Sequence, residues 1–185
     1  RLKTLATHPV WREPRTVFGV WMLTGVIFVI VKLLIGKYNN YKIFEGVYWH
    51  AIEGLTLYGD HYPEIMIQII MESYLAYHSS FRPVTGMVGI ILWIAGNTAL
   101  LFYAISRLPL SSTQKIIIYW YSYCELMTAQ GVQQFNISVA AFILLSFVLI
   151  LEKKDFWAAG IIMLGTFIKI YPIVGLAFFS SQGRK

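Results

Sequence analysis

The chain has 185 residues, of which 57% are hydrophobic and 16% aromatic but only 13% charged, and its mean hydropathy is +0.62. This composition is too apolar for an ordinary soluble domain, so we expect a polytopic membrane protein. The net charge of +6 comes from short basic clusters that flank apolar runs, and we therefore expect no nucleic-acid partner. Because the chain begins at Arg1 and stops just after an apolar run, we also expect a fragment of a longer protein.

Residues 1–15 form a basic leader in which Pro9 and Pro14 discourage a long helix. The positive-inside rule predicts that this leader lies in the cytoplasm. Residues 16–35 are apolar over the length needed to cross the hydrocarbon core, so they are the predicted first transmembrane helix. Lys32 lies close to the far end of this helix, where its side chain can reach the outer interface.

Residues 36–83 are predicted to lie outside and to contain five of the nine carboxylates of the chain. Between Tyr41 and Leu57 the apolar residues recur at helical spacing, which predicts an amphipathic helix on the membrane surface. A loop at 58–63 and a second helical run at 64–81 follow. Because most carboxylates are concentrated in this segment whereas the other loops are basic, we expect a reaction at the outer surface of the membrane.

Four further apolar runs complete an all-α, polytopic transmembrane bundle that forms a single domain. The predicted spans are 84–106, 116–128 and 137–151, followed by a broken helical hairpin at 156–179. Pro172 interrupts the last run, and a hairpin there leaves Arg184 and Lys185 on the cytoplasmic side and Lys169 at the outer turn.

Several short motifs follow one another along the chain in a fixed order. They are Asn39-Asn40-Tyr41-Lys42-Ile43-Phe44, Leu57-Tyr58, Tyr62-Pro63, Gln134-Phe135-Asn136, Glu152-Lys153-Lys154, Trp157-Ala158-Ala159-Gly160 and Lys169-Ile170-Tyr171-Pro172. Together they resemble glycosyltransferase family 87, the polyprenyl-phosphate-mannose-dependent mannosyltransferases of the GT-C superfamily. The chain departs from the family at Asn40, where an Asp is common, and at 65–82, where a Tyr-x-Pro-Pro region is expected.

The resemblance implies a GT-C-like fold and a membrane-embedded hexosyltransferase, with mannose as the expected sugar. The donor would be a polyprenyl-phosphate-linked sugar, and the acceptor a glycan or glycolipid on the non-cytoplasmic face. Membrane lipid surrounds such an enzyme, and we expect it in a bacterial inner membrane with the active site on the periplasmic side. No cofactor is implied.

Glycosyl transfer needs a carboxylate near the acceptor hydroxyl, which takes up its proton. The candidate catalytic residues all come from the outer segment: Asp60, Glu45, Glu53, Glu64 and, at the motif position, Asn40. Asn40 cannot act as a base, and Asp60 is the first choice because it lies in a loop beside His61. Taken singly, each of these acids is better explained as the solvated face of an interfacial helix.

Transfer also needs cations or hydrogen-bond donors that stabilise the departing phosphate. The candidate phosphate ligands are Lys169, Arg82 and His61, of which Lys169 is the strongest because an ammonium at a helix break in a membrane needs an anion or a polar cavity. Snorkelling to headgroups is the alternative for Lys169. The candidate sugar or acceptor ligands are Tyr171, Gln134, Asn136 and Glu125.

Simpler roles stay open for two of these ligands. Asn136 could cap the fourth span, and Glu125 could accept hydrogen bonds from neighbouring helices. The histidines lack the spacing of a helical zinc motif, so no metal site is expected.

Two other functions stay open. A secondary transporter fragment would use Lys32, Glu125 and Lys169 as coupling charges, although its charges should lie near the midplane with little structure outside the membrane. A non-catalytic lipid-binding membrane protein is the third interpretation, and Asn40 favours it because an amide cannot take up a proton.

Overall fold

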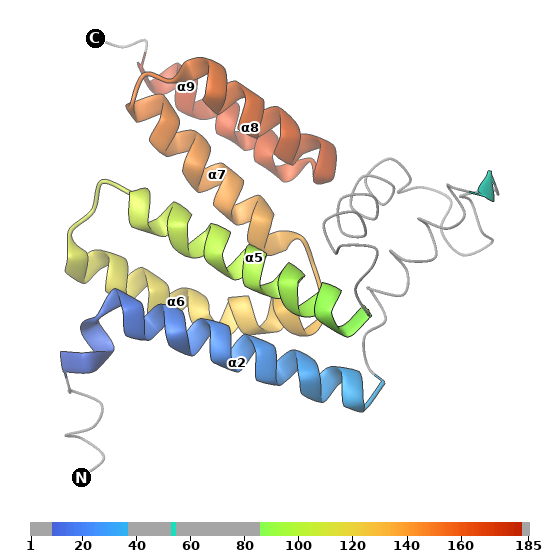
Figure 1. Ribbon diagram of the computed structural model, residues 1–185. Coiled ribbons are helices and arrows are strands. Elements are labelled where there is room, and N and C mark those ends of the chain that lie inside the picture. Colours follow the sequence, from blue (N-terminus) through green and yellow to red (C-terminus); the bar gives the residue numbers. More distant parts are fainter. Residues whose placement is uncertain (1–8, 37–52, 55–85, 183–185) are drawn as a thin grey trace.

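The computed structural model describes residues 9–36, 53–54 and 86–182, and these residues are helical with no strand (Figure 1). The predicted all-α class is therefore confirmed. The elements in chain order are η1 (Pro9–Arg12), α2 (Pro14–Leu34), α5 (Gly86–Arg107), α6 (Ser112–Gly131), α7 (Asn136–Leu151), α8 (Asp155–Ile168), η2 (Tyr171–Leu176) and α9 (Ala177–Gln182). The amphipathic helices predicted between the first two spans lie outside the described residues, apart from Glu53 and Gly54.

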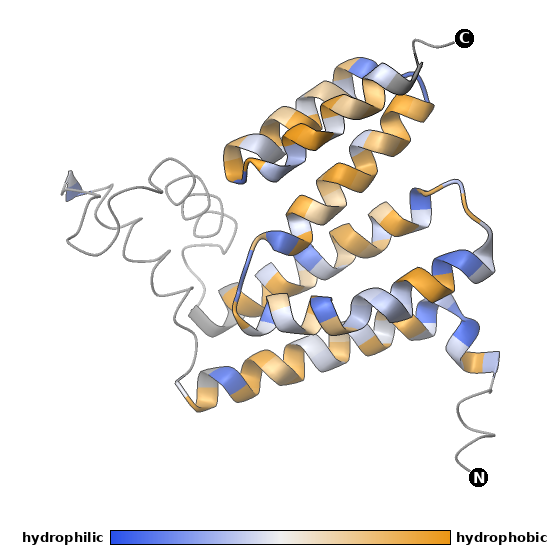
Figure 2. Cartoon of the chain, turned by 180° about the vertical axis from the view of Figure 1, so that it is seen from behind, coloured by the Kyte–Doolittle hydropathy of each residue, from blue (hydrophilic) through white to orange (hydrophobic). Residues whose placement is uncertain are grey.

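Helices α2 and α5 are each long and apolar enough to cross a membrane, over Pro14–Lys32 and Ile90–Arg107. Hydrophobic residues predominate along α2 (Figure 2). Several of its large apolar side chains, including Leu23, Ile27 and Leu34, are exposed. A soluble protein would bury such a surface, whereas a bilayer solvates it. Helices α7 and α8 are shorter apolar helices.

Helix α6 begins earlier than the predicted span at 116–128, and the reason is local. Ser111 accepts a hydrogen bond from the backbone N–H of Gln114, and the Gln114 side chain accepts one from the backbone N–H of Ser111, at 2.9 Å. This capping box satisfies backbone donors that the first turn would otherwise leave unpaired. The helix therefore starts at Ser112, inside the polar loop.

The helices alternate in direction along the chain. Helices α5 and α7 run the same way, because Asn97 at the middle of α5 meets Ser138 near the beginning of α7, and Arg107 meets Glu152 at their ends. Helices α2, α6 and α8 run the opposite way. One end of the bundle, which we call the site end, therefore carries the last residues of α2, α6 and α8 and the first residues of α5 and α7 (Figure 1).

An aromatic core joins α2, α5 and α6. The rings of Phe102 and Tyr119 stack at a centroid distance of 4.4 Å, and Trp21 meets Tyr119 edge-on at 5.5 Å. The Tyr119 hydroxyl donates a hydrogen bond to the Phe102 carbonyl at 3.2 Å. Such ring pairs add to the apolar burial that holds the three helices together.

Buried polar side chains link α5 to α6 and to α7 nearer the site end. Gln130 Nε2 donates to Thr98 Oγ1 at 2.5 Å, and the Ser138 hydroxyl donates to Asn97 Oδ1. A Cβ at Gly25 would collide with the Gln130 amide, so glycine allows α2 to approach α6 here. Hydrogen bonds of this kind between helices stabilise a bundle in lipid, where no water competes for the donors.

The chain turns back on itself after α8. Helix α8 ends at Ile168, four residues before Pro172, because the proline ring would clash with the carbonyl of residue 168 in a continued helix. Segment η2 then packs along α8 and α7 in the reverse direction: a Cβ at Gly165 would lie 2.8 Å from Pro172, and one at Gly175 would lie 2.8 Å from Ile162. The absence of side chains at Gly165 and Gly175 therefore allows η2 to pack closely against α8.

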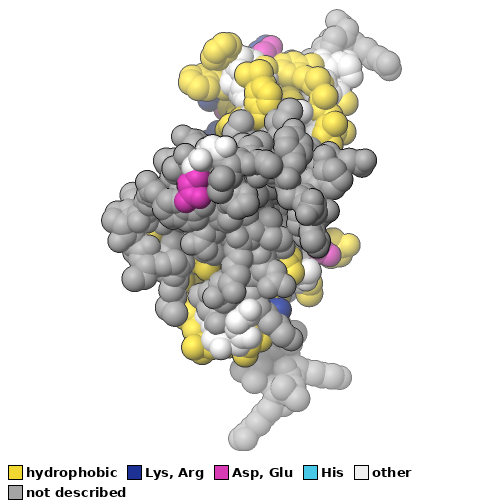
Figure 3. Space-filling view, turned by 90° about the vertical axis from the view of Figure 1, so that its right-hand side faces the viewer, with side chains coloured by type: hydrophobic (Ala, Val, Ile, Leu, Met, Phe, Trp, Pro, Cys, Tyr) yellow, Lys and Arg dark blue, Asp and Glu magenta, His cyan; other side chains and the backbone are white. Residues whose placement is uncertain are grey.

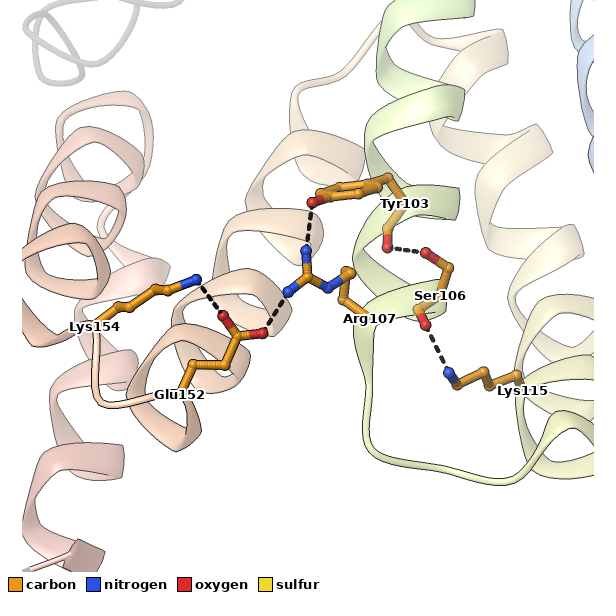
Figure 4. Close-up of polar contacts among 6 residues, drawn as sticks. All are labelled: Tyr103, Ser106, Arg107, Lys115, Glu152 and Lys154. Atoms are coloured by element: carbon orange, nitrogen blue, oxygen red, sulfur yellow. Dashed lines mark hydrogen bonds and ion pairs between the residues drawn. The ribbon is translucent and has the colours of Figure 1, made fainter.

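Charged side chains gather at the end of the bundle opposite the site end. Arg107 at the end of α5 forms an ion pair with Glu152, which also accepts a hydrogen bond from Lys154 at 2.7 Å (Figure 4). Lys115 donates to the Ser106 carbonyl at 2.6 Å across the loop between α5 and α6. We call this the basic end, because its described cations outnumber its carboxylates: Arg12, Arg15, Arg107, Lys115, Lys153 and Lys154 against Glu13, Glu152 and Asp155.

Candidate active site

The connection between α6 and α7 builds one wall of the candidate site. Phe135 is 3% exposed and packs on Trp93 at a ring distance of 4.3 Å and against the buried Ile168. Phe135 immediately precedes Asn136, and Ile168 immediately precedes Lys169. This apolar contact therefore brings the two polar neighbours to the same place, although they are 33 positions apart.

Three predicted ligands form a chain of hydrogen bonds there. Lys169 Nζ donates to Asn136 Oδ1 at 3.0 Å, and Asn136 Nδ2 donates to Gln134 Oε1 at 2.7 Å. The prediction that Asn136 could cap α7 is wrong, because the N-cap position is Phe135 and no side chain caps this helix. The Asn136 amide instead turns toward Gln134 and Lys169.

Lys169 occupies the break after α8 in extended conformation, with φ −145° and ψ 142°. Its side chain is half-buried, and its backbone N–H still donates to the Gly165 carbonyl at 2.8 Å. The ammonium group is therefore held at the site end by the Asn136 amide. A cation fixed at a helix break near a membrane surface can bind a phosphate.

A cavity of about 570 Å³ opens between α5, α6 and α7. Glu125 of α6 lines it together with Gln134 and Asn136, whereas the rest of its wall is mainly aliphatic. The structure thus brings Glu125, Gln134 and Asn136 to one cavity. Its volume is that of a small-molecule binding site.

The Glu125 carboxylate has no hydrogen-bond or ion-pair partner among the described residues, and the side chain is exposed. The prediction that Glu125 bonds to neighbouring helices therefore fails within this part of the chain. Glu125 lies six residues before the end of α6, about 9 Å from it at the helical rise.

Other predicted residues are placed apart from this cavity or outside the described chain. Tyr171 is 65% exposed on η2 and does not line the cavity. Glu53 is exposed. The candidates that lie outside the described residues are Asn40, Glu45, Asp60, His61, Glu64 and Arg82. Seen from the site end, the described side chains that border this face are mainly hydrophobic (Figure 3).

Sequence reasoning missed Gln133. Its backbone has φ 48°, a left-handed conformation that is uncommon for a residue with a side chain. This turn buries Gln133 to 2% exposure, and neither atom of its amide has a hydrogen-bond partner within the described part of the chain. The adjacent Gln134 points to the cavity instead. Nothing in a Gln-Gln pair distinguishes the two, because the backbone conformation decides which amide turns inward.

The three charged residues that a transporter would use, Lys32, Glu125 and Lys169, do not contact one another. Lys32 lies over the Phe28 ring at 5.4 Å on α2, whereas Lys169 bonds to Asn136 and Glu125 faces the cavity. Among the described residues, no three His, Cys, Asp or Glu side chains come close enough to hold a metal ion.

The apolar helices indicate an integral membrane protein, and its cavity has Glu125, Gln134 and Asn136 in the wall. The family model of glycosyltransferase family 87 matches residues 79–185, which is more than half of the chain. The chain therefore belongs to glycosyltransferase family 87, as its motifs predicted. No curated protein and no solved structure matches it.

Family membership makes the protein a membrane glycosyltransferase with sugar donor and acceptor substrates. The matched region contains α5 to α9 and hence the cavity, the Gln134-Phe135-Asn136 turn and Lys169. Of the predicted site residues that the structure describes, all except Glu53 lie within it.

Proposed function

We propose that this protein transfers a hexose, with mannose as the first candidate, from a polyprenyl-phosphate carrier to a glycan or glycolipid acceptor on the non-cytoplasmic face of a bacterial inner membrane. The observation that carries this proposal is the hydrogen bond between Lys169 and Asn136 at the break after α8. It holds a cation where the phosphate of a lipid carrier would lie, beside a cavity lined by amide and carboxylate side chains.

The charges of the two bundle ends support the orientation. The described cations of the basic end belong in the cytoplasm by the positive-inside rule. The site end then faces the other side of the membrane. Helix α2, which precedes the acidic segment 36–83, ends at the site end, and helix α5, which follows that segment, begins there. Lys169 and that segment would share one side of the membrane.

In the proposed reaction Lys169 stabilises the phosphate that departs from the anomeric carbon, and Gln134 and Asn136 hydrogen-bond sugar hydroxyls or phosphate oxygens. Arg82, His61 and Tyr171 remain secondary ligands in this proposal. The proton of the acceptor hydroxyl needs a carboxylate, and the outer segment offers Asp60, Glu45 and Glu53. Glu125 offers a second source at the cavity.

Transfer of radiolabelled mannose from polyprenyl-phosphate-mannose by the full-length protein tests this proposal. Lys169→Met should lower kcat/KM on the order of 100-fold, because one preorganised group that stabilises developing charge contributes about that much. Lys169→Arg should retain part of the activity, and Lys153→Met at the basic end should leave it unchanged. Wild-type membranes without any transfer, or Lys169→Met with normal turnover, would contradict the proposal.

A further inference from the structure

The cavity between α5, α6 and α7 carries charge of one sign only. Among its lining residues, all of them described, Glu125 is the single charged side chain, and Lys169 is not part of the lining. A phosphate in this cavity would be repelled by the carboxylate and would find no cation among the described lining residues. A neutral hydroxyl would instead donate a hydrogen bond to Glu125.

The remainder of the cavity wall is suited to an apolar chain. Leu101 and Ile105 of α5, Ile118 and Leu126 of α6, and Ala140 and Leu144 of α7 line it. The cavity is therefore polar around Glu125, Gln134 and Asn136 and apolar elsewhere. A water-soluble sugar would leave the apolar wall without a partner, whereas a lipid-anchored hydroxyl compound would fill both parts.

Asn136 separates this cavity from Lys169. Its amide oxygen accepts from Lys169, while the residue itself lines the cavity. A cation therefore lies on the α8 side of the start of α7, and a carboxylate lies on the α6 side. This arrangement provides separate places for an anionic leaving group and a neutral hydroxyl.

We propose that the cavity is the acceptor site, that it binds an uncharged lipid-anchored compound with a free hydroxyl, and that Glu125 is the carboxylate that takes up the hydroxyl proton. The proposal rests on the proposed transferase function. The hydroxyl oxygen forms a bond to the anomeric carbon of the sugar, and the bond from that carbon to the phosphate oxygen breaks. The phosphate leaves with the electron pair beside Lys169, and the proton passes to Glu125.

The first experiment measures mannose transfer to octyl mannoside by the full-length protein. Glu125→Gln should lower kcat by on the order of 100-fold or more, as expected for a lost general base, while the KM for the donor stays within about twofold. In the wild type, kcat should fall toward low pH. In Glu125→Gln, the remaining kcat should no longer show this fall. Glu125→Asp should recover part of the rate, and Glu13→Gln is the matched control.

Asp60→Asn is measured in parallel to decide whether Asp60 or Glu125 is the general base. Loss of turnover in Asp60→Asn together with a normal rate in Glu125→Gln would overturn the assignment of Glu125 while leaving the transferase function intact. Absence of transfer by the wild type would instead reject the transferase function.

The second experiment fills the cavity. Ala140 is an exposed lining residue, so Ala140→Trp should raise the KM for octyl mannoside at least fivefold and leave the KM for the donor unchanged. Ala159→Trp on an exposed position of α8 is the control. Methyl mannoside, which lacks the chain, should be a much poorer acceptor for the wild type. A raised KM for the donor in Ala140→Trp would show that the carrier chain occupies the cavity and would overturn the acceptor assignment.

Discussion

Lys169 Nζ lies 3.0 Å from Asn136 Oδ1 and joins two motifs that are 33 positions apart. The contact depends on the packing of their neighbours Ile168 and Phe135. It places an ammonium group and an amide at one end of the bundle, beside a cavity with a carboxylate in its wall. Apolar packing of Phe135 and Ile168 thereby brings the ammonium group of Lys169 to the amide of Asn136.

Asn136→Ala should weaken donor binding, because Lys169 loses the acceptor that orients it. A hydrogen bond to a charged group contributes about 1.5–3 kcal/mol, so the KM for the donor should rise by about 10- to 100-fold if the whole bond is lost in the bound state. The double-mutant cycle with Lys169→Met checks this, because the two changes should be strongly non-additive. Additive effects would mean that the pair does not act as a unit.

Gly165→Ala should destabilise the return of the chain after α8. The new Cβ would lie 2.8 Å from Pro172, so η2 must shift at a cost of about 1–3 kcal/mol. Gly160→Ala on the same helix is the matched control, since nothing lies within 4 Å of that position and alanine favours the helix. Thermal unfolding in nanodiscs measures both, and equal melting temperatures would contradict the close packing.

Ser138→Ala should destabilise the contact between α5 and α7, because the buried Asn97 amide loses the hydroxyl that donates to it. Hydrogen bonds between helices in membranes contribute about 0.6–2 kcal/mol. Ser180→Ala, whose exposed hydroxyl donates to the Ala177 carbonyl within its own turn, should change the free energy of unfolding much less. A Ser138→Ala protein as stable as the wild type would mean that Asn97 finds another partner.

Glu152 should make the stability of the basic end depend on pH. Hydrogen bonds from Lys154 and Arg107 lower the pKa of this carboxyl below its ordinary value of 4.5. A lowered folded-state pKa stabilises the protein above pH 4.5, and this contribution is lost as the pH falls through the folded-state value. The difference in melting temperature between wild type and Glu152→Gln should therefore shrink below pH 4.5.

Glu13→Gln is the control for this titration, because Glu13 forms no ion pair among the described residues. A constant difference between wild type and Glu152→Gln from pH 7 to pH 3 would mean that the ion pair with Arg107 does not stabilise the folded state.

Local chemistry makes several features of this protein readable from the sequence. Uninterrupted apolar runs can only be helices in lipid, because every backbone donor and acceptor must be satisfied within the run. Pro172 ends α8 by removing a donor and by its ring clash, both of which act within four residues. The family also follows from short motifs, and the family model confirms it.

Contacts between distant residues were decided only by the tertiary structure. The sequence marked Lys169, Gln134, Asn136 and Glu125 as candidate ligands, but neither the bond from Lys169 to Asn136 nor the shared cavity could be derived from them. The inward turn of Gln133 was equally hidden. Helical periodicity determines which residues share a face of one helix, whereas the packing of side chains such as Phe135 and Ile168 determines which faces meet.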